Sequence, residues 1–281
     1  MLIYNLHERN PNNIGDMMSA PALYANTDKH NRVVFGHILN PDAETVKSAD
    51  LVVIGGGGIA RYPYGYNIID VSRAAKKTVM WGVGIEDYNL LRWMKKGTIL
   101  GTRGKNTCDI PGNIHDVEQV HCASCLHNVF DGCSDMRNRD DYGSSDPFYF
   151  IHQAHVQYIN DLKASGKNVA LNNFSAGLDE IVGLMMRAPY VVTTSFHGAY
   201  WAALCGKRCY FMMLNGEKAM DGVGKFNGVK LPGVAFVSSE EEIKKLEEEK
   251  AVVPDIEFLN VARTSNYAMI TLLNMHFDNV R

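Results

Sequence analysis

The sequence predicts an α/β fold made of two doubly wound, Rossmann-like domains that face a cleft. Strand-like apolar runs alternate with helix-like runs along almost the whole chain, as in parallel sheets covered by helices. A polar stretch at 133–147, rich in Ser, Asp, Asn, Arg and Gly, interrupts this alternation once and divides it into two units. The Gly-rich and polar motifs follow predicted strands, where ligands bind in such sheets.

The composition supports a globular protein and argues against several partners. The 281 residues are 46% hydrophobic and 21% charged, which is enough for two cores. The net charge is −3, and Lys and Arg are spread along the chain, so nucleic acid is not expected as a partner. No apolar run is long enough to span a bilayer, and residues 1–8 become polar too soon for a signal peptide. The six Cys lack a disulfide-framework spacing, so we expect a reducing, cytoplasmic setting.

The first unit is read from apolar runs that end in polar or Gly-rich turns. The run at 50–54 is continuous and apolar, as expected for a strand buried on both faces, and the run at 78–83 is similar. Helical spacing of apolar residues and acidic residues near the first turn predict the helices. The predicted strands are 2–6, 33–39, 50–54, 78–83 and 98–103, and the predicted helices are 16–24, 42–48 and 87–96.

The second unit repeats this alternation, and a helix ends the chain. Ser238 or Ser239 is the expected cap of a charged helix. The predicted strands are 168–171, 190–193 and 209–214, and the predicted helices are 178–187, 197–205, 239–250 and 266–277. The predicted domains are an N-terminal Rossmann-like domain at 1–135, a C-terminal Rossmann-like domain at 150–262, and a terminal helix at 263–281 that packs back towards the first.

Residues 194–198, with the sequence Thr-Ser-Phe-His-Gly, form the most informative motif. They lie between a predicted strand and a predicted helix, so free backbone N–H groups and the positive end of the helix dipole face the crevice. Gly198 is expected to let a ligand approach the backbone, and His197 adds a titratable ring at the mouth of the helix. Together with Thr194 and Ser195 they predict an anion-binding site with a proton-handling residue.

Two further motifs follow strands in the first unit. Gly56, Gly57 and Gly58 belong to a G-x-G-x-x-A match, which is typical of dinucleotide binding, but the next strand does not end in the ribose-binding acid. A bare turn that leaves space at the floor of the cleft, or a plain tight turn, also fits. At residues 12–16, Gly15 permits close approach and Asp16 is a candidate base; alternatively Asn13 or Asp16 caps a helix.

Cationic residues supply candidate contacts to an anionic ligand. Arg103 ends a predicted strand and offers a planar fork for phosphate or carboxylate, although a solvated surface Arg fits as well. Lys225 lies in a Gly-rich loop at 221–228 that either closes over a ligand or is an ordinary surface loop. Cys122 and Cys125 have zinc-type spacing between two His, but no second ligand pair matches, so we expect buried thiols and no metal.

The motifs at 13–16, 55–57, 82–85, 101–103 and 194–198 occur in this order in the polysaccharide pyruvyl transferase family, which the chain resembles. The resemblance implies a GT-B-like fold and transfer of a pyruvyl group from phosphoenolpyruvate to a sugar of a surface glycan. It implies that His197 is catalytic or binds the donor phosphate and that Gly198 and its helix hold that phosphate. Asp16 and Gly15 would lie near the acceptor, so the resemblance makes 1–135 the acceptor domain and 150–262 the donor domain. One branch of the family has Arg where this chain has Ser195, and the family often has Asp where this chain has Gly104.

The leading hypothesis is a metal-independent transferase without a cofactor, most simply a pyruvyl transferase of glycan biosynthesis. Asp16, or else His7 or Glu8, would act as base on a sugar hydroxyl, and the partners would be a small-molecule donor and a glycan acceptor. The alternative is a nucleotide-sugar-dependent glycosyltransferase, because a diphosphate also binds at a helix N-terminus. A third hypothesis is a catalytically silent carbohydrate-binding or scaffold protein.

Overall fold

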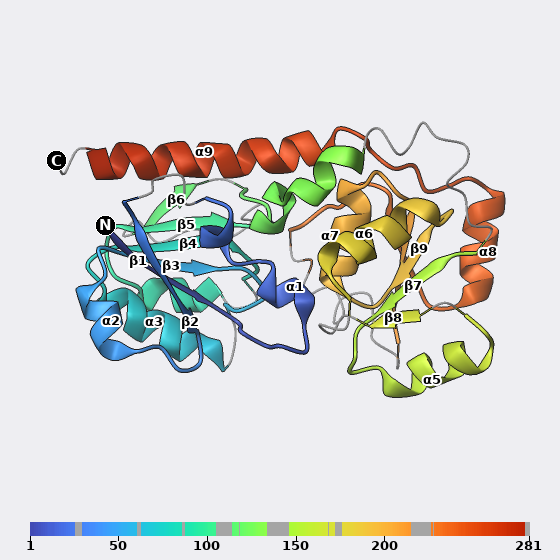
Figure 1. Cartoon of the computed structure of the whole chain (residues 1–281), viewed down its shortest axis with the longest axis horizontal. Coiled ribbons are helices and arrows are strands. Elements are labelled where there is room, and N and C mark those ends of the chain that lie inside the picture. Colours follow the sequence, from blue (N-terminus) through green and yellow to red (C-terminus); the bar gives the residue numbers. More distant parts are fainter. Residues whose placement is uncertain are drawn as a thin grey trace.

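Two parallel β-sheets, one in each half of the chain, form the framework of the protein (Figure 1). The structure is a computed structural model. It describes residues 1–25, 30–60, 63–85, 88–104, 114–117, 119–133, 146–167, 169–171, 176–214, 226 and 228–278.

The first sheet has six strands in the order β2-β1-β3-β4-β5-β6, and every pair is parallel. All five strands predicted for this half are confirmed. The sixth strand, β6, was not predicted. Strands were predicted from continuous apolar runs, and two of the four residues of β6 are polar. The strands are β1 (Leu2–His7), β2 (Arg32–His37), β3 (Leu51–Gly55), β4 (Thr78–Val83), β5 (Thr98–Thr102) and β6 (Ile114–Val117).

The second sheet has five parallel strands in the order β11-β10-β9-β7-β8. The three predicted strands of this half are confirmed as β8, β9 and β10. The prediction misses β7, which directly follows the irregular stretch, and β11. The strands are β7 (Phe148–Ile151), β8 (Val169–Leu171), β9 (Val191–Thr193), β10 (Cys209–Met212) and β11 (Val234–Val237).

Helices cover both faces of each sheet, so the α/β prediction with Rossmann-like units is confirmed. On the first sheet, α2 (Ala43–Ser48) and α3 (Tyr64–Ala74) pack on one face and α9 (Phe258–Asp278) on the other (Figure 1). On the second sheet, α5 (Val156–Ala164) and α8 (Glu240–Glu248) share one core. On its other face, α6 (Leu178–Arg187) and α7 (Phe196–Leu204) share another.

The helix predicted at 16–24 is wrong. The helix α1 (Ile14–Met17) ends early, and a separate 3₁₀ turn, η1 (Pro21–Leu23), follows. Pro21 lacks a backbone N–H and cannot continue an α-helix, which explains the break. The segment predicted as a helix at 87–96 contains the 3₁₀ helix η2 (Tyr88–Trp93) instead.

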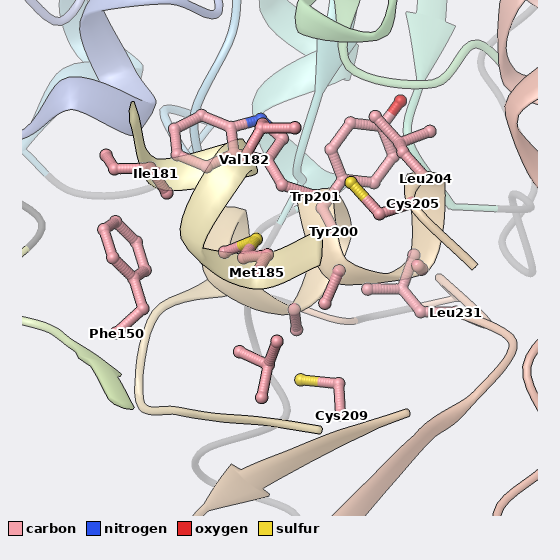
Figure 2. Close-up of a cluster of buried hydrophobic side chains, with 14 of the residues drawn as sticks. Phe150, Ile181, Val182, Met185, Tyr200, Trp201, Leu204, Cys205, Cys209 and Leu231 are labelled. Carbon is pink, nitrogen blue, oxygen red and sulfur yellow. The ribbon is translucent and has the colours of Figure 1, made fainter. Parts of the chain in front are cut away.

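The largest hydrophobic core joins the two halves. Around the face of the second sheet that α7 covers, it collects buried side chains from α6, α7, β7 and β10 (Figure 2). It also includes Ile14 of α1, Phe258 of α9, and Cys122, Cys125 and Phe130 from the 3₁₀ segment η3 (Ala123–Leu126) and η4 (Asn128–Gly132) and its flank. The start of α9 therefore packs with the second unit, while Met269 and Leu273 in its second half pack on the first sheet.

Both sheets share one strand order. Numbered within its own unit, each reads 2-1-3-4-5, and the first sheet adds β6 at its edge. In this topology the order reverses between the first and third strands, and the crevice at their carboxyl ends is the usual ligand site. That crevice lies after β1 and β3 in the first sheet and after β7 and β9 in the second. The domain bounds and a ligand cleft between the units remain predictions.

Candidate functional site

The turn after β1 carries Asn13 and Asp16. Asn13 is the helix cap, and the capping residue also holds Asp16, the candidate base. Asn13 caps α1, because its Oδ1 accepts from the backbone N–H of Gly15 at 3.1 Å and of Asp16 at 3.4 Å. The Asn13 Nδ2 donates to Oδ2 of Asp16 at 2.6 Å. The cap therefore orients the Asp16 carboxylate at the first crevice.

The turn after β3 lies directly against that carboxylate. Gly56 and Gly57 have positive φ angles of 81° and 71°, which favour glycine. A Cβ added at Gly57 would lie 3.2 Å from Oδ1 of Asp16, and one added at Gly56 would overlap Ser19. We expected this bare turn to leave space at the floor of the cleft. At Gly56 that expectation is wrong, because Ser19 fills the space. Gly58 belongs to the same turn.

The imidazole of His197 lies where the two units meet. A Cβ added at Gly15 would overlap Nδ1 and Cγ of His197, so the bare backbone of α1 packs against the ring. The Nε2 lies 3.8 Å from Sγ of Cys122, and Phe196 and Trp201 flank the ring. His197 is only 5% exposed. The ring is therefore enclosed, and the expectation that it lies at the open mouth of the α7 helix is wrong. It nevertheless contacts Gly15, the residue before the candidate base Asp16.

Gly198 has a different role from the one expected. A Cβ there would overlap Oγ1 of Thr193 and lie 2.7 Å from the ring of Phe150, so this glycine lets α7 pack on its own sheet. The expectation that its bare Cα admits a ligand is wrong. Thr194 ties the two crevice loops together, because its Oγ1 accepts from the backbone N–H of His152 after β7 at 2.9 Å. Ser195 is the buried N-cap residue of α7.

Arg103 brings a positive charge to the first turn of α7. It follows β5, is 2% exposed, and its guanidinium carbon lies 4.0 Å from the centre of the Phe196 ring. A Cβ added at Gly84, after β4, would overlap its Nη2. The solvated-surface alternative for Arg103 is therefore wrong. Guanidinium and helix N-terminus together favour an anion.

Cys122 lies among these charges. Burial raises the pKa of its thiol, and the charges of Arg103 and Asp16 act on it in opposite directions, lowering and raising the pKa respectively. One small region therefore holds an imidazole, a guanidinium, a carboxylate and a thiol. The zinc-type spacing of Cys122 and Cys125 made Cys122 a candidate ligand, but that spacing does not predict the contact of Cys122 with His197.

The other cysteines have separate neighbours. The Cys125 Sγ lies 3.3 Å from Nδ2 of Asn266, and the Sγ atoms of Cys133 and Cys205 lie 3.4 Å apart. Across the parts of the chain that the structure describes, no three His, Cys, Asp or Glu side chains are grouped as metal ligands.

His7 and Glu8, the other candidate bases, make different contacts. His7 ends β1 beside β2, with its ring 6.0 Å from that of Phe35. Burial, and then the charge of Arg9, lowers the pKa of His7 to about 4, so the ring is neutral at pH 7. The Glu8 carboxylate accepts a hydrogen bond from the hydroxyl of Tyr64. Lys225 lies outside the described residues.

Comparisons with known proteins give one family. The family model for polysaccharide pyruvyl transferase matches residues 6–215. A crystal structure of a functionally uncharacterised protein from Klebsiella pneumoniae is similar at 15% identity and a TM-score of 0.46, covering 85% of this chain and 92% of that one. No curated protein matches the sequence. Within the described residues, no helix is long and apolar enough to cross a membrane.

Proposed function

The chain belongs to the polysaccharide pyruvyl transferase family, and from this premise we propose that it moves a pyruvyl group from phosphoenolpyruvate to a sugar of a surface polysaccharide. Family membership makes the protein a transferase of glycan biosynthesis. The donor, the GT-B-like arrangement around a cleft, and the role of each residue belong to the proposal. One observation supports it above the others: Gly15 of α1, which follows β1, contacts His197 of α7, which follows β9.

The donor is assigned to the second crevice. Phosphoenolpyruvate carries a phosphate and a carboxylate, and the N-terminus of α7 offers backbone N–H groups to one anionic group. The fork of Arg103, stacked on Phe196 in the first turn of α7, offers paired donors to the other. Thr194 and Ser195 border the same turn, and Gly198 contributes its backbone only.

The acceptor is assigned to the first crevice. Asp16 is half-buried and its carboxylate is oriented by Asn13. A carboxylate held in this way is suited to accept a proton from a sugar hydroxyl. Gly57 leaves room for the carboxylate beside the turn after β3. The N-terminal unit would therefore supply the base, and the C-terminal unit the donor.

The reaction balances without a cofactor or an oxidant. One sugar hydroxyl adds to C2 of the enolpyruvyl group while C3 gains a proton and becomes a methyl group. A second hydroxyl of the same sugar then displaces the phosphate, which leaves a pyruvate ketal and inorganic phosphate. Asp16 would remove a hydroxyl proton, and His197, in its imidazolium form, would protonate C3 or the departing phosphate.

Binding requires access to His197, which Gly15 and Cys122 enclose. We place the required movement between α1, which follows β1, and α7, which follows β9, while residues 122–124 stay bonded to α7. Opening would separate α1 from α7 to admit the donor, and closure would exclude water. The part of α9 that carries Met269 and Leu273 would stay packed on the first sheet.

An assay with both substrates tests the proposal. The protein is incubated with phosphoenolpyruvate and candidate glycans, and phosphate release is measured together with the acceptor mass. We expect release that depends on both substrates, formation of a pyruvate ketal, and loss of both in His197→Gln with thermal stability retained. Ketal formation at the wild-type rate in His197→Gln would remove His197 from the mechanism.

Thermal shift separates the other hypotheses. A ligand at about a hundredfold its dissociation constant stabilises the folded state by roughly 2.7 kcal/mol. We expect stabilisation by phosphoenolpyruvate. Stabilisation by UDP or GDP alone would identify a glycosyltransferase. Stabilisation by a glycan alone, with no transfer in any assay, would identify a binding protein.

A further inference from the structure

The face of α7 that carries His197 contacts one short segment of the chain through three side chains. His197, Tyr200 and Trp201 are spaced i, i+3 and i+4, so they share a helix face. The Tyr200 hydroxyl donates to the backbone carbonyl of Cys122 at 3.0 Å. The Trp201 Nε1 donates to Oγ of Ser124 at 3.1 Å. The third contact is the 3.8 Å approach of His197 Nε2 to Cys122 Sγ.

These contacts fix where the thiol lies. Two hydrogen bonds hold the backbone at Cys122 and the side chain at Ser124 against α7, and Cys122, Ser124 and Trp201 are fully buried. A side chain in such a packed interior keeps one rotamer. The Cys122 thiol therefore remains beside Nε2 of His197 for as long as α7 and η3 are packed together.

The direction of the hydrogen bonds follows from the chemistry of their groups. The indole N–H of Trp201 can only donate, so the Ser124 oxygen accepts from it. The Ser124 hydroxyl proton is then available to Cys122 Sγ, which lies 3.3 Å away. The Cys122 S–H proton is in turn available to Nε2 of His197. Burial raises the pKa of this thiol, so the S–H proton is retained at neutral pH.

We propose that Trp201, Ser124 and Cys122 form a directed hydrogen-bond chain that holds neutral His197 with its ring proton on Nδ1. In this arrangement Nε2 accepts from the thiol, and the Nδ1 proton faces Gly15, the residue before Asp16. Cys122 is thus a positioning residue, and its effect on the rate rests on the proposed function of His197. The chain fixes Nδ1 as the nitrogen whose N–H faces the N-terminal unit. A neutral imidazole does not give up its last proton, so the ring acts as an acid only after Nε2 has taken up a second proton from solvent.

The tautomer is measured directly by NMR of the full-length protein with ¹⁵N-labelled histidine. The His197 signals are assigned by their absence in His197→Gln. At neutral pH we expect the wild-type ring to be protonated on Nδ1 and unprotonated on Nε2. We expect Cys122→Ala to shift the ring towards Nε2–H, and Cys122→Ser, which keeps a donor, to retain the wild-type tautomer. A wild-type ring protonated on Nε2, or an unchanged ring in Cys122→Ala, would overturn the chain.

The rate is measured separately as pyruvyl transfer. We expect kcat to fall about tenfold in Cys122→Ala with an unchanged KM for phosphoenolpyruvate, as for the loss of an orienting partner, and to recover in Cys122→Ser. The matched control is Cys209→Ala, since Cys209 is equally buried in the same hydrophobic core but lies on β10. Its tautomer and kcat should match those of the wild type. A shifted tautomer in Cys122→Ala with an unchanged kcat would refute the positioning role of Cys122. If every tautomer were as expected but the wild type showed no pyruvyl transfer, only the proposed function would be refuted.

Discussion

At the residue scale, the contact between Gly15 and His197 makes Gly15 one of the least replaceable glycines. Its bare Cα lies against the imidazole, and any Cβ would overlap Nδ1 and Cγ. We expect Gly15→Ala to push the ring from Cys122, destabilise the fold by about 1–3 kcal/mol through overpacking, and abolish transfer. Urea denaturation and the phosphate-release assay measure the two effects.

Gly132→Ala is the matched control for this prediction. No atom lies within 4 Å of a Cβ added at Gly132, within the described residues, and its φ is not positive. Its stability and activity should therefore equal those of the wild type. If Gly15→Ala behaved like Gly132→Ala, the close packing of α1 on His197 would not exist in solution.

Arg103 is a second residue whose identity is constrained by geometry. Its planar guanidinium lies over Phe196 and beside Gly84, and a Lys ammonium reproduces the charge but neither the stacking nor the paired donors. We expect Arg103→Lys to raise the KM for phosphoenolpyruvate about tenfold, which corresponds to about 1.4 kcal/mol.

Arg73→Lys is the control, because Arg73 is exposed on α3 and its Nε donates to the backbone carbonyl of Trp93. Its KM should be unchanged. An unchanged KM in Arg103→Lys as well would show that the donor binds elsewhere.

At the element scale, α9 connects the two units, and Asn266 anchors it. The Asn266 Oδ1 accepts from Nε1 of Trp81 on β4 at 2.8 Å, and its Nδ2 donates to the carbonyl of His121 at 3.2 Å. Both contacts are buried, so Asn266→Ala leaves a donor and an acceptor without a partner. We expect a loss of about 1–3 kcal/mol for each, measured by denaturant unfolding.

Thr271→Ala, five residues further along α9, provides the comparison. Thr271 is exposed and its hydroxyl bonds only within the helix, to the carbonyl of Tyr267. Its loss should change stability by less than about 0.5 kcal/mol. Equal stability of the two variants would contradict an anchoring role for Asn266.

At the scale of the whole molecule, two buried histidines make stability depend on pH. Burial lowers the pKa of His121 to about 4, and burial with the charge of Arg9 lowers that of His7 to about 4, from an ordinary value of 6.5. Below pH 6.5 the unfolded chain binds protons that the folded chain does not. Stability is therefore full above pH 6.5 and falls as the pH drops towards 4.

His121→Phe tests this dependence. The ring of His121 packs against those of Tyr200 and Phe258, so Phe retains an aromatic contact and removes one titrating group. We expect the loss of unfolding free energy between pH 7 and pH 5 to be smaller in the variant by about 1–2 kcal/mol. Identical pH profiles would show that His121 is solvated in the folded state.

The fold was largely predictable because its signals are local. Apolar runs such as 50–54 and 78–83 identify parallel strands directly, and helical spacing places 178–187 and 239–250 almost to the residue. The short strands β6, β7 and β11 were missed, since four residues provide little periodicity. The prediction of a helix at 16–24 was wrong because Pro21 cannot continue an α-helix, whatever the spacing of the apolar residues around it.

The candidate site was predictable only in part. Placement of motifs after strands indicated Asp16, Arg103 and His197, because topology brings the carboxyl ends of parallel strands to one edge. The reason for Gly198 was wrong, since a glycine that admits a ligand and one that admits a neighbouring strand look alike in sequence. The pairing of Cys122 with His197 joins residues 75 positions apart, and no local pattern encodes it.

By itself the sequence determined the alternating α/β architecture, the family, and the strand-to-helix turns that carry the candidate chemistry. These follow from periodicity and turn chemistry within a few residues of one another. The tertiary structure alone decided that Gly15 closes over His197, that Arg103 stacks on Phe196, and that a thiol faces the imidazole. Those contacts depend on how two sheets and α9 pack together, and packing is set by side chains that are distant in the chain.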